Sequence, residues 1–115
     1  MPIERWSDSI VVVHVADDPQ FSEDVAAVQH LTPACSAVLD FATVHYVNSS
    51  CIAKLLRLRR HCISQDVRLV ICNVNNPVWG TLLMTGLDKI FEVSENVPTA
   101  LATLQMQEPA KKARN

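Results

Sequence analysis

Short runs of β-branched and other apolar residues alternate along this chain with segments of helical periodicity. Such an alternation favours an α/β fold, in which helices make right-handed crossovers between parallel strands. We therefore predict a sheet of four or five strands, mostly parallel, with an N-terminal hairpin and about four helices packed mainly on one face. The predicted strands are residues 3–6, 10–15, 37–41, 67–74 and 90–93.

The longest predicted helix covers residues 50–65. At about 100° per residue, its apolar side chains occupy one arc and its basic side chains the opposite arc. Arg59 falls inside the apolar arc, so we expect its stem to pack at the boundary with its charged head in water. The apolar arc contains Ile52, Leu55, Leu56, Leu58, Cys62 and Ile63, and the basic arc contains Lys54, Arg57, Arg60 and His61.

Capping residues predict the other helices. Ser22 is a candidate N-cap for a short helix, and Asn76 followed by Pro77 is typical of a helix start, with Gly86 as the matching stop. Pro98 opens a final helix. We predict one domain over residues 1–106 and a disordered polar tail over residues 107–115.

The composition sets broad limits on function. The 115 residues carry a formal net charge of -2 and are 49% hydrophobic, which favours a single soluble globular domain. No apolar run is long enough to span a bilayer, and residues 1–9 do not resemble a secretion signal, so we expect a cytoplasmic protein without membrane contact. The four cysteines form no CxxC pair, which favours reduced core thiols in a reducing compartment.

Three motifs occur in a fixed order. Asp40 closes a buried apolar strand, Asn48-Ser49-Ser50-Cys51 begins the long helix, and Thr85-Gly86-Leu87-Asp88 precedes the last strand. In this order and spacing the chain resembles the STAS family, and in particular its anti-sigma factor antagonists. The resemblance covers residues 37–93 in residue detail and the whole chain in element order.

The resemblance implies a non-enzymatic regulatory module that binds an anti-sigma factor, often a serine kinase, and so frees a sigma factor. The family's phosphorylated serine corresponds to Ser49. The helix entrance there favours an anion, because its backbone N–H groups are unpaired. We expect the partner to contact Asn48, Ser49, Ser50, Lys54, Arg57 and His61, and we expect no cofactor.

Four alternatives to this regulatory role arise from the same residues. Asn48 and Cys51 stand where the family has Asp and Gly, so a scaffold or oligomerising subunit that is never phosphorylated is the second hypothesis. Small-ligand or nucleic-acid binding through the basic arc is a third, and the aromatic content of 5% argues against nucleic acid. A hydrolase built from Asp40, His45 and Ser49 lacks a nucleophile elbow. A zinc site at Cys51 and Cys62 is excluded by their separation of about 16 Å along a helix.

Overall fold

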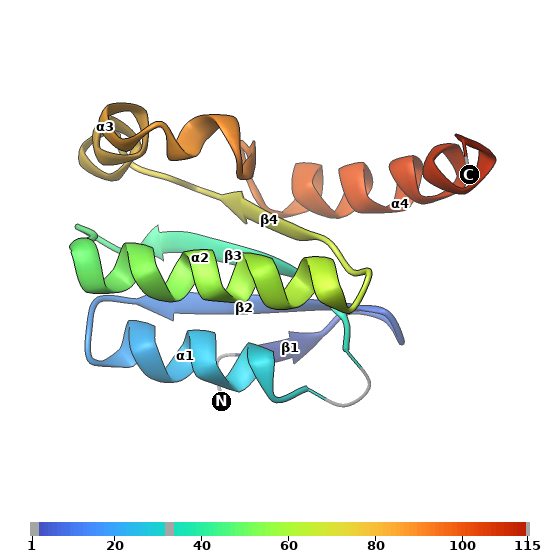
Figure 1. Ribbon diagram of the computed structural model, residues 1–115, viewed down its shortest axis with the longest axis horizontal. Helices are drawn as coiled ribbons and strands as arrows, with labels where there is room; N and C mark the ends of the chain where they lie inside the picture. The colour runs from blue at the N-terminus through green and yellow to red at the C-terminus, as the bar shows by residue number, and fades with distance from the viewer. Residues whose placement is uncertain (1–2, 32–33, 115) are drawn as a thin grey trace.

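One sheet organises the computed structural model, which describes residues 3–31 and 34–114, with side chains through residue 105 (Figure 1). Within this part of the chain the sheet has five strands in the order β1-β2-β3-β4-β5. β1 pairs antiparallel with β2, and all other neighbours are parallel. The mostly parallel sheet and its N-terminal hairpin confirm the prediction. The strands are β1 (Ile3–Arg5), β2 (Ile10–Ala16), β3 (Ser36–Thr43), β4 (Leu69–Cys72) and β5 (Glu92–Ser94).

The helices lie on both faces of the sheet, with three of the four on one face. These three are α1 (Gln20–Gln29), α2 (Ser49–Ser64) and α3 (Asn76–Thr85), and a short 3-10 helix η1 (Leu87–Lys89) follows α3. α4 (Val97–Arg114) covers the opposite face. α4 continues over the range in which we expected a disordered tail from residue 107, and the domain boundary at residue 106 stays a prediction.

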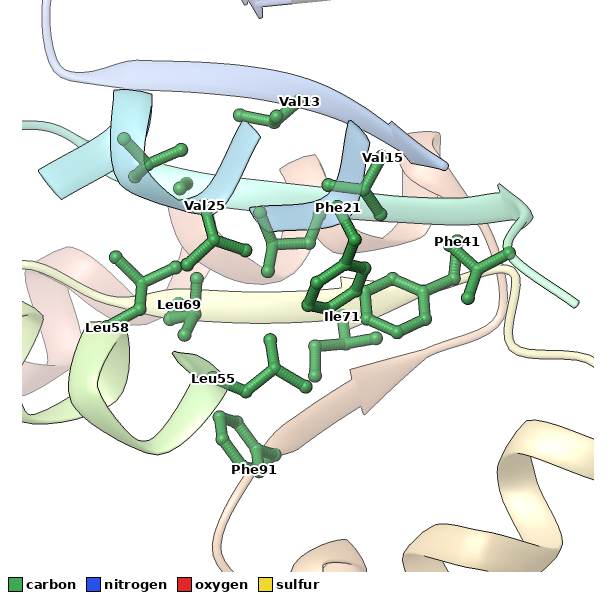
Figure 2. Packing of buried hydrophobic residues seen from close by; sticks show 14 of the residues in the cluster. Val13, Val15, Phe21, Val25, Phe41, Leu55, Leu58, Leu69, Ile71 and Phe91 are labelled. Atoms are coloured by element: carbon green, nitrogen blue, oxygen red, sulfur yellow. The ribbon is translucent and has the colours of Figure 1, made fainter. Parts of the chain in front are cut away.

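The alternation of side chains in β3 builds the core on both faces. Leu39 and Phe41 join the larger cluster beneath α1, α2 and α3, whereas Val38 joins the smaller cluster beneath α4. Phe41 meets Phe21 of α1 edge to face, with ring centroids 5.8 Å apart. Figure 2 shows these two rings beside Leu55 of α2. Because the central strands β2, β3 and β4 are covered on both faces over most of their length, they read as largely continuous apolar runs in the sequence.

The buried stripe of α2 differs from the predicted arc in one respect. Its buried residues are Cys51, Leu55, Leu58 and Cys62, whereas Ile63 is 60% exposed. The centre of this stripe lies about 110° away from Ile63 around the helix, so Ile63 falls outside the contact with the sheet. The four cysteines are buried and form no disulfide, as predicted for core thiols. Burial raises the pKa of Cys62 to about 11.

The helix caps are partly as predicted. Gly86 ends α3 in the left-handed conformation with φ 77°, which confirms the predicted stop. The N-cap of α3 is Asn75, one residue before the predicted Asn76, and its side chain accepts a hydrogen bond from Val78 N. Ser22 does not cap α1, which begins at Gln20 after Pro19.

Candidate functional site

Ser49 lies at the corner where the chain enters α2. Asn48 is the N-cap of this helix, and its Oδ1 accepts a hydrogen bond from Cys51 N at 2.9 Å. Ser49 and Ser50 are the first two helical residues, and the side chains of Asn48, Ser49 and Ser50 are exposed. Asn48 therefore caps the helix while Ser49 remains accessible.

The loop before this corner, residues 44–48, is anchored on two sides. From α3, Asn75 Nδ2 donates to the Val44 carbonyl at 2.7 Å. From the end of β2, Asp17 accepts from His45 N at 2.8 Å and lies 2.8 Å from His45 Nδ1. The hydrogen bond from His45 N, followed by the contact with its ring, lowers the pKa of Asp17. The serine is thus presented by a loop with fixed attachments rather than by a free segment.

A second carboxylate, Asp18, lies beside the start of α2. Asp18 Oδ1 accepts from both the backbone N and the hydroxyl of Ser22, and Oδ2 lies 3.4 Å from Cys51 Sγ. The hydrogen bond from the Ser22 hydroxyl lowers the pKa of Asp18. Burial raises the pKa of Cys51, so this thiol is protonated at neutral pH and acts as the donor.

Asp17 and Asp18 are not among the site residues predicted from the sequence. A signal for them exists, because both follow β2 directly and the carboxyl ends of adjacent parallel strands meet at one edge of a sheet. Applied to β2 and β3, this rule places the two carboxylates beside the segment between Phe41 and Ser49.

The basic residues predicted for the surface follow α2 away from the serine. Lys54 Nζ donates to Ser50 Oγ at 2.7 Å, so Lys54 belongs to the corner itself. Arg57 is exposed and His61 is half-buried on the same side of the helix. His61 lies twelve residues after Ser49, or about 18 Å along the axis. The six predicted residues therefore form an elongated strip rather than a compact cluster.

The residues considered for a hydrolase have other partners. Asp40 Oδ2 lies 2.7 Å from His14 Nδ1, and both residues lie on the same face of the sheet as α4, beyond the part that α4 covers. His45 instead contacts Asp17. Asp40 and His45 therefore do not form a relay toward Ser49.

His14 lies between two carboxylates on that face of the sheet. Its Nδ1 contacts Asp40, and its Nε2 contacts Glu4 of β1. A neutral imidazole has only one N–H, so only the protonated ring donates to both. The contact with Glu4, and to a smaller extent the contact with Asp40, raises the pKa of His14. Burial acts in the opposite direction but does not outweigh these contacts. Burial favours a higher pKa for Asp40, but hydrogen bonds from Asn73 and Ala42 N and the His14 contact lower it overall.

Two structural features limit the kinds of site. Within the described residues, no group of three or more His, Cys, Asp and Glu side chains is placed to hold a metal ion. No helix in this part of the chain has the length and apolarity needed to cross a bilayer.

Comparison with protein families identifies the chain. The sequence model of the STAS domain matches residues 8–100, which is most of the chain. The protein belongs to the STAS family. Comparison with curated protein sequences finds no match.

Solved structures share this fold at low sequence identity. An anti-sigma-factor antagonist (STAS) domain protein from Planctomyces limnophilus superposes with a TM-score of 0.75 at 14% identity, covering 90% of this chain and 97% of that one. A chain from the stressosome, described as a signal integration and transduction hub, gives 0.68 at 22% identity, covering 90% and 96%. The anti-sigma factor antagonist SpoIIAA in its unphosphorylated form gives 0.61 at 12% identity, covering 98% and 96%. At these identities the likeness establishes the fold alone.

Proposed function

We propose that this STAS protein is a non-enzymatic, cytoplasmic anti-sigma factor antagonist, which binds an anti-sigma factor or serine kinase through the Ser49 corner and α2. The observation that carries this proposal is the exposed Ser49 at the start of α2, in a loop anchored by Asp17 and Asn75. A rigid loop loses little conformational entropy when a partner binds, so its exposed groups are well suited to recognition.

Phosphorylation of Ser49 would act as the switch. A phosphate adds roughly -1.5 to -2 charge units at the positive end of the α2 dipole. Lys54 Nζ donates to the hydroxyl of the neighbouring Ser50, so a positive charge stands at the same corner. The same charge would repel an acidic partner that docks on the strip of Lys54, Arg57 and His61, so modification would release the partner.

Substitutions at adjacent serines test the switch. The wild-type chain, tagged, captures its partner from the native cell, and the identified partner is then titrated with each variant. We expect Ser49→Asp to weaken binding about tenfold or more, because one desolvated like charge costs at least a factor of ten, and Ser49→Ala to bind as the wild type does. Ser50→Asp is the comparison variant: Ser50 belongs to the same predicted contact surface, but its added charge would lie beside Lys54, so we expect a smaller loss of affinity than for Ser49→Asp.

Either acidic substitution lies in the first turn of α2, where a negative charge stabilises the helix, so misfolding does not confound the comparison. Equal affinity of Ser49→Asp and the wild-type chain for the captured partner would exclude the switch.

The second candidate is a scaffold or oligomerising subunit that is never phosphorylated. Asn48 and Cys51 favour it, because Asn48 places no carboxylate next to the acceptor and the Cys51 side chain is buried against Asp18, which fixes the backbone where the family has glycine. Intact-mass measurement on protein isolated from its native cell separates the candidates. A species heavier by one phosphate, mapped to Ser49, would exclude the scaffold.

A further inference from the structure

A cavity of about 340 Å³ lies at the end of the molecule away from Ser49. One wall is the last turns of α2, including Arg59 and Ile63, and the other is the segment from Ile90 into β5. The start of β4, with Arg68, completes it. Arg59 is ten residues, or about 15 Å, along α2 from Ser49, so the cavity is separate from the proposed switch.

Arg59 is the residue that interrupts the apolar arc of α2. Its Nε donates to the carbonyl of Ile90 at 3.1 Å, which holds the guanidinium across the cavity between its two walls. Within the described residues, the ion pairs do not include Arg59. Its remaining N–H groups are therefore available to an acceptor from solution.

Arg68 adds a second guanidinium with incomplete hydrogen bonding. Its Nε donates to Glu92 Oε1 at 3.0 Å, and its Nη2 also contacts Glu92. The side chain is only 13% exposed, and Nη1 is buried without a hydrogen-bond partner in the described part of the chain. A buried N–H group without an acceptor is unfavourable, and natural proteins usually supply one from water or a ligand.

Apolar side chains border these two cations. Ile63 is 60% exposed and Ile90 is 42% exposed, and both line the cavity. Large aliphatic side chains exposed on both rims of one cavity offer an apolar body the contacts that water does not. The lining thus combines charged and apolar side chains.

The charges of the lining select among anions. Arg59 and Arg68 are balanced by Asp66 and Glu92, so the formal charge around the cavity is zero. Because Arg68 is already paired with Glu92, a single negative charge matches the guanidinium of Arg59, whereas the second charge of a dianion such as a phosphate monoester has no further unpaired cation in this lining. At about 340 Å³ the cavity is at the small end of the roughly 300–1,000 Å³ range of ligand sites, which suits a small molecule.

We propose that this cavity binds a small monocarboxylic acid with an apolar body. The carboxylate accepts hydrogen bonds from the guanidinium of Arg59, and the positive charge of Arg68 lies in the same lining. The hydrocarbon part packs between Ile63 and Ile90. The site is independent of Ser49 and does not rest on the anti-sigma antagonist role.

Titration of the ¹⁵N-labelled full chain with octanoate, at constant ionic strength, tests the proposal. We expect saturable shifts of the backbone amides of Arg59, Ile63 and Ile90, with those of Ser49 and Ser50 unmoved. For ten non-hydrogen atoms at the efficiency of ordinary ligands, half-saturation falls at about 10 mM or below. Octylamine, which has the same hydrocarbon chain and the opposite charge, should not bind there.

Arg59→Gln should weaken octanoate binding about tenfold, because it removes charge-assisted hydrogen bonds to the carboxylate. Arg57→Gln is the matched control, since Arg57 is exposed on the other side of the same helix. The amide spectra of both variants report whether the fold is intact. The proposal is overturned by octylamine or inorganic phosphate binding as tightly as octanoate, by equal octanoate affinity of Arg59→Gln and wild type, or by no saturable shift in this range.

Discussion

Replacing Asn48 by alanine should destabilise the protein by removing the cap of α2. Asn48 Oδ1 accepts the hydrogen bond from Cys51 N at 2.9 Å, and alanine leaves that N–H to water. Loss of an N-cap of this kind costs 0.5–2 kcal/mol and typically about 1 kcal/mol of the free energy of unfolding. For a domain of 115 residues this lowers Tm by about 4 °C.

Asn48→Asp separates the effect of an added charge on stability from the effect of losing the cap. Aspartate keeps the acceptor oxygen and adds a negative charge at the positive end of the α2 dipole, a gain of about 0.3–1 kcal/mol. Asp17 and Asp18, which flank the same corner, oppose that gain, so we expect the stability of this variant to lie within about 0.5 kcal/mol of the wild type.

Urea unfolding of the full chain, with midpoints compared at equal m-value, measures both effects. Asn76→Ala is the control, because Asn76 is exposed and follows the cap of its own helix, so its replacement should change stability by less than about 0.5 kcal/mol. The assignment of Asn48 as the cap is wrong if Asn48→Ala unfolds at the same midpoint as the wild type, or if Asn76→Ala is as destabilising.

Three further predictions concern the fold. Because the folded pKa of His14 is raised, its ion pairs stabilise the protein fully below the unfolded pKa of about 6.5, and this stabilisation is lost as pH rises through the folded pKa. For ion pairs at the surface the stabilisation is about 1 kcal/mol. In urea titrations the wild-type chain should therefore lose its greater stability relative to His14→Gln between neutral and alkaline pH. A constant difference across this range would contradict it. Gly80→Ala should stabilise α3 by about 0.5–1 kcal/mol, since open space surrounds the position of the added Cβ. Gly86→Ala should instead destabilise the protein by about 1 kcal/mol or more, because the backbone there has φ 77°. If thermal melts show that both substitutions shift Tm in the same direction, the reasoning is wrong. Leu55→Ala in the buried stripe of α2 should cost about 2–5 kcal/mol and Ile63→Ala much less, and similar losses in denaturant unfolding would contradict the observed burial.

Much of the fold follows from local patterns. The predicted helix at residues 50–65 is observed as Ser49–Ser64, and Gly86 ends α3 where it was predicted to. These features depend on periodicity and on single-residue backbone preferences, which are visible within a few residues of sequence. The predicted cap of α3, Asn76, lies one residue after the observed cap, Asn75, because the prediction placed Pro77 at the first helical position and the structure has it at the second.

Local patterns of residues predict the order of strands and helices, the apolar cores of the strands and the position of Ser49 at the start of the long helix. They do not predict which distant groups meet around Ser49 in the folded chain: Asp17 with His45, Asp18 with Cys51, and Asn75 with the loop before Ser49. Backbone preference and periodicity act only between near neighbours in the chain. These contacts instead depend on the register of parallel strands, which brings together segments about 30 residues apart.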